Sequence, residues 1–338
     1  MEVDARAQLP AADRAVLAAL FADYARVAVE GALSGGFSGA RVLKVTPFRD
    51  GATPELPTVV KIGAADLIRQ EHAAYRRHIR GRLSGIPEVW GEPAFSADGA
   101  VGGLRYGLVG AGLFEFVSLA RYAESAAPAD LAHVLESRVF VHLSTIWRQS
   151  RLVTDAPLSE AYADFLRPDR SAHFAAALTG MGVAIDLGAA TVVAPSGGAT
   201  APTMSHTALP NPLAALPDLL ARPIPHRIAT IHGDLNLENV LVDPDARTVR
   251  LIDFSHSRED HVLHDLLRLE TGLVTRVLPG KLAAAGLDVS AVIGLYRRLH
   301  TAADAGLGVD GGTGATPGSL HSPPLPPTGP GERRHLRW

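Results

Sequence analysis

Asp234 and Asn239, five residues apart in the string His-Gly-Asp-Leu-Asn-Leu-Glu-Asn, constrain the fold more than any other feature of the chain. Residues 240–242 are apolar, and so are residues 249–252 apart from Arg250; an Asp-Pro-Asp turn separates the two segments, so they predict a β-hairpin. The second run leads directly into Asp253. The sequence therefore predicts a carboxylate on a tight turn, with an amide and a second carboxylate brought together across a hairpin.

These three side chains are the types that phosphoryl transfer from a Mg-nucleotide requires. Asp234 can accept the proton of an acceptor hydroxyl, and a positioned base of this kind contributes about 10²–10⁴ in rate. The amide oxygen of Asn239 and the carboxylate of Asp253 suit Mg²⁺, which prefers oxygen ligands and retains waters. His232, on the same turn, is expected to hydrogen-bond the loop backbone. Taken singly each residue could cap a turn or end a strand, so the prediction rests on their joint spacing.

Lys61 and Glu71 are candidates for the other half of such a site. Lys61 lies among apolar residues in a predicted strand at 57–63, where an ammonium group needs an anionic partner. A helix predicted over 66–79 carries Glu71 on its inward stripe, from which the carboxylate could hold Lys61 toward the phosphates. The alternatives are an edge strand with Lys61 facing water and a Glu71 paired with a surface arginine.

A small-residue turn between two β-prone runs could bring backbone N–H groups close to phosphate oxygens. An ordinary hairpin connection is the alternative. The residues of this turn are Ser34, Gly35, Gly36, Phe37 and Ser38. Two more strands are predicted at 104–109 and 113–117, and the end of the second is expected to face the nucleotide base with the backbone of Glu115, Phe116 and Val117.

The order of the predicted elements indicates an α+β chain with two lobes. A helix at 1–30 is expected to pack on a small antiparallel β-sheet lobe at 31–117. A larger, mainly helical lobe follows at 118–300, with an insertion at 151–228 that either determines specificity or is a plain surface excursion. The Gly- and Pro-rich tail at 301–338 is expected to be disordered and could link to a partner domain. Long helices are predicted at 131–147, 263–277 and 289–302.

Composition excludes several classes of function. The net charge of −3, from 32 Lys and Arg against 35 Asp and Glu, provides no basic field for nucleic acid. There is no cysteine, which excludes disulfides and thiolate metal sites and favours a cytoplasmic location. Neither an export signal nor a membrane span is predicted. The spacing of His256, His261 and His264 is only weakly suggestive of zinc, and packing or surface histidines are the preferred interpretation.

Three strings resemble the Brenner-type motif of the aminoglycoside phosphotransferase and choline kinase group, which shares the protein-kinase-like fold. They are H-G-D-x₄-N at 232–239, I-D-F at 252–254 and H-D-L at 264–266. The longer strings around them look most like the kinase-like effector domains of actinobacterial multidomain proteins described as ternary complex associated domains. The similarity covers about residues 31–300 and implies ATP and Mg²⁺ as cofactors. It implies these roles: Asp234 as base, Asn239 and Asp253 as metal ligands, Lys61 as phosphate contact, Glu71 as its partner and Asp265 as a structural acid.

The short span between Asp253 and Asp265 leaves no room for a long activation segment, so a small hydroxyl-bearing acceptor is expected rather than a protein. The acidic residues within 151–228 are dispersed and do not favour a polycationic aminoglycoside. The expected function is an ATP-dependent phosphotransferase acting on a hydroxyl of a small molecule. The alternative is a nucleotide-binding regulatory or effector module of the same fold with weak or no catalysis.

Overall fold

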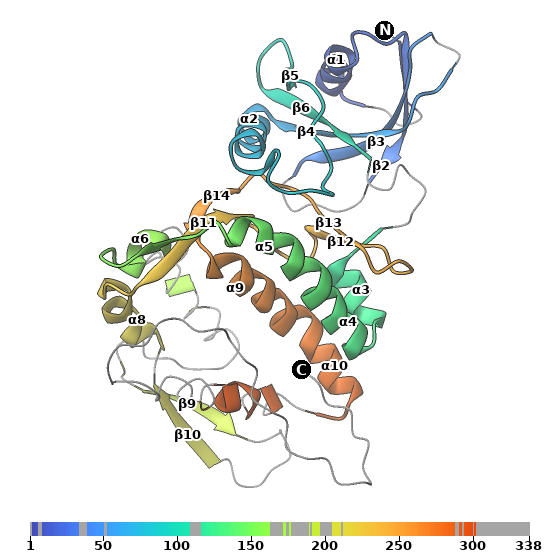
Figure 1. Ribbon diagram of the computed structural model, residues 1–338. Helices are drawn as coiled ribbons and strands as arrows, with labels where there is room; N and C mark the ends of the chain where they lie inside the picture. Colours follow the sequence, from blue (N-terminus) through green and yellow to red (C-terminus); the bar gives the residue numbers. More distant parts are fainter. Residues whose placement is uncertain are drawn as a thin grey trace.

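A computed structural model shows an α+β chain with the two lobes of a protein-kinase-like fold (Figure 1). The residues that the structure describes are 2–5, 9–33, 39–50, 53–108, 116–162, 172–173, 176, 189, 191–196, 205–210, 212–287, 291–292, 294–299 and 301. A curled sheet with two helices forms the small lobe. Helices and short strands form the large lobe, and the candidate site lies where the two meet.

The sheet of the small lobe has the strand order β1-β2-β3-β4-β6-β5. Its strands are β1 (Glu2–Ala5), β2 (Arg26–Ala32), β3 (Arg41–Phe48), β4 (Thr58–Ala64), β5 (Ala94–Phe95) and β6 (Val101–Gly107). The predicted antiparallel sheet is mixed, because β1 pairs with β2 in parallel. Helix α1 (Ala11–Leu20) separates these two strands and makes the crossover that parallel pairing requires.

The first predicted helix is shorter than expected and is followed by a strand. It ends at Leu20, and the chain from Arg26 onward is β2, in which Val27 and Val29 are buried on alternate positions. Val27 also continues a helical apolar series through Leu20 and Tyr24, but β-branched residues pack well on a sheet and β3 supplies the partner strand. Tertiary pairing therefore overrides the helical pattern here.

Two neighbouring glycines of β6 allow a helix to approach each face of the sheet. A Cβ on Gly103 would lie 2.5 Å from Val16 of α1, and one on Gly102 would lie 3.1 Å from Ile68 of the second helix. That helix is α2 (Ala65–Ala74), continued by the π-helical segment η1 (Tyr75–Ile79), as predicted for 66–79. Because successive residues of a strand face opposite sides, α1 and α2 cover opposite faces.

The large lobe contains two long helical runs. The first joins α4 (Pro128–Val134), the π-helical η3 (Leu135–Phe140) and α5 (Val141–Trp147), and the second joins α9 (Leu263–Gly272), the π-helical η4 (Leu273–Val277) and α10 (Leu278–Ala284). Both confirm predicted helices and extend them. Of the helix predicted at 289–302, the described residues are helical and the others lie outside the description. Helix α3 (Leu119–Ser125) precedes the first run.

Short elements fill the rest of this lobe. They are β7 (Val117–Ser118), β8 (Arg151–Val153), α6 (Leu158–Tyr162), β9 (Thr191–Ser196), β10 (Ser205–Pro210), α8 (Pro212–Ala221), β11 (His226–Ile231), β12 (Val240–Val242), β13 (Val249–Leu251) and β14 (Arg258–His261). Strands β9 and β10 pair antiparallel within the insertion expected at 151–228. Strand β11 lies between β14 and β8.

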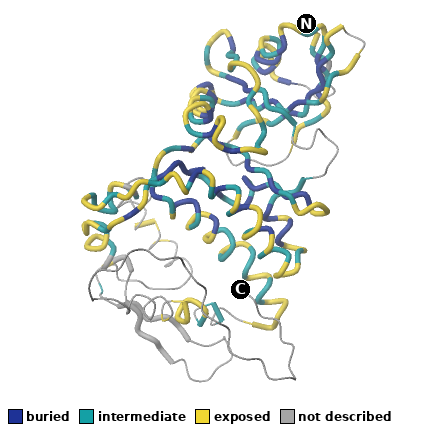
Figure 2. Tube along the Cα trace, viewed as in Figure 1, coloured by how far each residue is buried: buried dark blue, intermediate teal, exposed yellow. Residues whose placement is uncertain are grey.

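Each lobe has its own buried core, and the larger core extends into the small lobe. Tyr75 and Ile79 of η1, and Leu83 after it, pack in the core of the large lobe. Figure 2 shows buried segments in both lobes. Hydrogen bonds between described residues also join the lobes: for example, Gln70 Nε2 donates to the Ser255 carbonyl at 3.1 Å, and Arg82 donates to the Thr230 hydroxyl at 2.9 Å. The contact between lobes is thus both apolar and polar. None of the helices in the described part of the chain is long and apolar enough to cross a membrane.

Candidate active site

The turn after β11 depends on a glycine. Gly233 has φ +84°, and a Cβ there would lie 2.0 Å from the carbonyl oxygen of His256. Only a residue without a side chain fits both conditions. The turn places Asp234 beyond the end of a buried strand, with 29% of its side chain exposed.

Asp265 of α9 anchors this turn from below. Its side chain is fully buried, and its carboxylate accepts hydrogen bonds from the backbone N–H groups of His232 at 2.8 Å and Gly233 at 2.9 Å. The indole N–H of Trp147 donates to it at 3.4 Å. The imidazole of His232 contacts the Ile252 carbonyl at 3.0 Å. The structure thus places His232 and Asp265 as scaffold around the turn.

Asn239 and Asp234 lie together within one loop. The amide N–H₂ of Asn239 donates to the carbonyl of Asp234 at 2.9 Å and lies 3.3 Å from its carboxylate oxygen Oδ2. The side chain of Asn236 donates to the same Oδ2 at 3.0 Å. Asn239 makes both of its contacts with Asp234 through its side-chain amide nitrogen. Its side-chain oxygen therefore points away from these bonds and is available to a cation.

The hairpin between Asn239 and Asp253 forms as predicted. Strands β12 and β13 pair antiparallel, and the N–H of Ile252 donates to the carbonyl of Asn239 at 3.0 Å. Asp253 then adopts φ +62°, which is uncommon for a residue other than glycine. The hydroxyl of Ser255 donates to its Oδ1 at 2.9 Å. Such strained backbone is typical of functional sites.

Lys61 joins the two lobes at the centre of the site. Its ammonium lies 2.7 Å from Glu71 Oε2 and 3.0 Å from Asp253 Oδ1. The hydroxyl of Tyr106 donates to the other oxygen of Glu71 at 2.6 Å. Lys61 lies on β4 opposite Leu104, and Tyr106 follows two residues later on β6, so both face the α2 side of the sheet. Edge-strand exposure of Lys61 is therefore wrong, since only 12% of its side chain is exposed.

The charges of this cluster stabilise one another. Burial lowers the pKa of Lys61, but the carboxylates of Glu71 and Asp253 outweigh burial and raise it overall. Burial raises the pKa of Asp253, yet the Lys61 charge and the hydrogen bonds from Lys61 and Ser255 bring it below its usual value. Burial raises the pKa of Glu71 against the effect of Lys61. Both oxygens of Glu71 accept short hydrogen bonds, one from Tyr106 and one from Lys61, and these bonds favour its ionised form.

The donor set fits Mg²⁺ bound together with phosphate. Among the described residues, no hydrogen bond involves the side-chain oxygen of Asn239 or Oδ2 of Asp253. An amide and a carboxylate are hard oxygen donors, and Mg²⁺ completes such a pair with waters and phosphate oxygens. The described part of the chain contains no group of three or more His, Cys, Asp and Glu that could hold a metal without a substrate.

The histidines near β14 form a packed cluster and not a metal site within the described residues. Both His261 and His264 are buried, whereas His256 is exposed. The hydroxyl of Tyr162 lies 2.5 Å from Nδ1 of His261, and the Tyr162 ring stacks on the ring of His264. Their proximity to Tyr162 agrees with the packing interpretation.

Several predicted site residues cannot be placed. The turn 34–38 and Glu115 lie outside the described residues. Of the segment expected to face the nucleotide base, Val117 belongs to β7 and pairs with Val242 of β12. The first strand of the large lobe, β7, therefore lies beside the hairpin that carries Asn239 to Asp253.

Sequence reasoning missed Arg268 and Tyr106. Arg268 donates through Nε to Oδ1 of Asp234 at 3.0 Å. It follows Asp265 by three residues on α9, and this helical spacing is the signal that places both on the side of the loop that carries Asp234. Tyr106 could have been found from strand alternation, because Leu104, two residues before it, is opposite Lys61.

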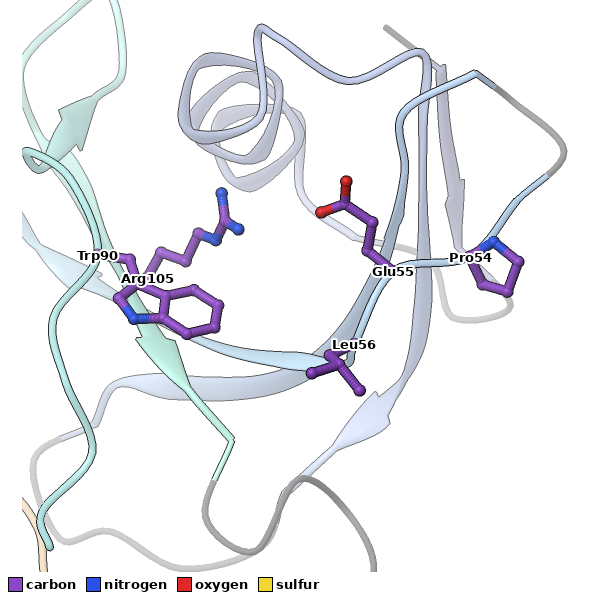
Figure 3. A pocket seen from close by; sticks show the side chains of 5 residues that line it. All are labelled: Pro54, Glu55, Leu56, Trp90 and Arg105. Atoms are coloured by element: carbon purple, nitrogen blue, oxygen red, sulfur yellow. The ribbon is translucent and has the colours of Figure 1, made fainter.

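A hollow of about 530 Å³ on the small lobe is separate from this cluster. Trp90 and Arg105 line one side of it, and Pro54, Glu55 and Leu56 line the other (Figure 3). Arg105 lies 4.7 Å from the ring centroid of Phe21, next to α1. The hollow is therefore on the face of the sheet opposite Lys61.

Comparison with known proteins gives one family and several similar folds. The family model described as ternary complex associated domain 9 matches residues 25–178 and 189–315. No curated protein matches the chain. The aminoglycoside phosphotransferase APH(3'')-Id from Streptomyces rimosus, in complex with ADP and streptomycin, is 16% identical with TM-score 0.39, over 82% of this chain and 91% of that one. Aminoglycoside phosphotransferase APH(4)-Ia is 18% identical with TM-score 0.41, over 75% of each chain. Macrolide 2'-phosphotransferase type I is 17% identical with TM-score 0.38, over 84% and 85%.

Proposed function

Since the chain belongs to the family described as ternary complex associated domain 9, whose model spans both lobes, we propose that this family member is an ATP-dependent phosphotransferase. Its acceptor is a hydroxyl group of a small molecule, and its cofactors are ATP and Mg²⁺. The protein would act in the cytoplasm. The observation that supports this most is the position of Lys61, between Glu71 of the small lobe and Asp253 of the large lobe. A lysine with little solvent exposure, held at the junction of two lobes, has the charge and the place to contact nucleotide phosphates.

The reaction follows from the residues around that lysine. The acceptor oxygen forms a bond to the γ-phosphorus, the bond from that phosphorus to the β,γ-bridging oxygen breaks, and ADP leaves. The carboxylate of Asp234 accepts the hydroxyl proton. Lys61 contacts phosphate oxygens while Glu71 and Tyr106 keep its chain oriented. Asn239 and Asp253 would hold Mg²⁺, which neutralises phosphate charge when it is bound.

Turnover of Mg-ATP by three variants tests the proposal. We expect Asp234→Asn to retain nucleotide affinity and to lose about 10²-fold or more in kcat, because it removes only the base. Lys61→Met should weaken ATP binding and lower kcat together. Lys44→Met removes a lysine that pairs with Glu30 on the neighbouring strand at 2.9 Å, and it should change neither value.

The outcome that contradicts the proposal is a wild-type protein that does not bind Mg-ATP, or a turnover that Asp234→Asn leaves unchanged. Nucleotide binding without transfer to any acceptor or to water would instead favour a regulatory module of the same fold. Calorimetry with a non-hydrolysable ATP analogue distinguishes a protein that does not bind the nucleotide from one that binds it without transferring phosphate.

A further inference from the structure

The helix below the catalytic loop contacts that loop at every fourth residue. Arg268 of α9 pairs with Asp234, and Arg276 of η4 pairs with Glu238 at 2.7 Å. Gly272 lies midway between them, where a Cβ would be 2.9 Å from Leu237. Residues four apart share one face of a helix. One face of α9–η4 therefore contacts the loop at three points, and the close contact of Gly272 with Leu237 lies between the two arginine pairs.

Arg268 uses only part of its hydrogen-bonding capacity. A guanidinium has five N–H donors in a planar fork, and the bond to Asp234 uses the single one on Nε. Within the described residues, the two terminal nitrogens of Arg268 donate to no other group. Half of the side chain, 49%, is exposed. An arginine that only oriented Asp234 would do so best with both edges of the fork, as a bidentate pair.

The place of these donors determines what they can contact. An acceptor hydroxyl must reach the carboxylate of Asp234, so the rest of the acceptor lies beside the guanidinium bonded to that carboxylate. The fork matches the two oxygens of a carboxylate or a phosphate, and it repels an ammonium. An ion pair this exposed contributes little to stability, so an incoming anion can share the guanidinium at small cost.

We propose that Arg268 is the acceptor-binding residue of the site and that the acceptor carries a carboxylate or phosphate next to the hydroxyl that is phosphorylated. This inference rests on the proposed function, since it assigns the substrate class of the same site. Polycationic and neutral alcohols are correspondingly poor ligands. Arg276 has the same charge and a similar exposure, but its pair with Glu238 is two helical turns away, so it does not take part.

Equilibrium binding tests the inference with three small probes on the full chain. D-glycerate and glycerol 3-phosphate carry the anion, and glycerol is their neutral counterpart. Titrations are made with the Mg²⁺ complex of a non-hydrolysable ATP analogue present, on the wild type, Arg268→Gln, Arg268→Lys and Arg276→Gln. Because a hydrogen bond between charged groups is strong, we expect Arg268→Gln to weaken binding of at least one anion by about tenfold or more. Arg268→Lys should recover part of that loss, and Arg276→Gln should bind as the wild type does.

Any of three results overturns the inference: no anion binds to the wild type, glycerol binds as tightly as the anions, or Arg268→Gln binds them unchanged. If Arg268 acted only in folding, Arg268→Gln would weaken binding of glycerate and of glycerol alike. Circular dichroism of each variant identifies a protein that has unfolded. Preference for glycerate over glycerol 3-phosphate, or the reverse, distinguishes the two anions. Mg-ATP turnover is measured separately, so that failure of anion binding with intact turnover overturns the inference and leaves the proposed function standing.

Discussion

Replacing the buried carboxylate under the catalytic turn by an amide should destabilise the protein and misplace its candidate base. Asp265 accepts backbone hydrogen bonds from His232 and Gly233, one on each oxygen. Asp265→Asn keeps one oxygen and replaces the other with a donor that faces an N–H group. One charge-assisted bond is then lost and a buried donor is left unsatisfied, which costs about 2–4 kcal/mol of unfolding free energy.

Urea denaturation of the wild type and the variant measures this difference directly. The matched control is Asp66→Asn, which makes the same chemical change at a side chain that is 97% exposed and paired with Arg69 in the same helix. Its unfolding free energy should stay within about 0.5 kcal/mol of the wild type, because exposed ion pairs contribute little. Mg-ATP turnover should fall in Asp265→Asn under conditions where it is still folded. Equal stability of Asp265→Asn and the wild type would refute the anchoring role.

Three other changes have outcomes set by the structure. Gly233→Ala should lose more than about 2 kcal/mol and abolish turnover, since it combines left-handed backbone with a clash against the His256 carbonyl; soluble, active protein would contradict this. Gly103→Ala should cost about 1–3 kcal/mol by pushing α1 from the sheet, while Gly31→Ala, with no atom within 4 Å, should cost less; thermal melts of both decide. Burial lowers the pKa of His261 and His264, so the unfolded chain binds protons first, and stability should fall as the pH drops below about 6.5; the urea midpoint of His264→Phe should vary less with pH than that of the wild type.

The parts of the fold predicted from sequence are those specified by local pattern. The helices at 66–79 and 131–147 and the hairpin before Asp253 follow from apolar periodicity and turn chemistry within short segments. The first helix extends too far in the prediction because Val27 fits both the helical series of Leu20 and Tyr24 and the alternation of a strand. The pairing of β1 with β2 was missed, because four residues carry too little pattern to indicate a partner.

By itself, the sequence determined the identity and spacing of Asp234, Asn239 and Asp253, because these lie on one loop and one hairpin whose geometry is set by neighbouring residues. It also indicated Lys61, since a charge among apolar residues requires a partner whatever the fold. Only the tertiary structure decided that Lys61 lies between Glu71 and Asp253, and that Arg268 shares the carboxylate of Asp234. Those contacts join separate elements, one of them across the lobes, and depend on how helices and sheets pack, which no local spacing specifies.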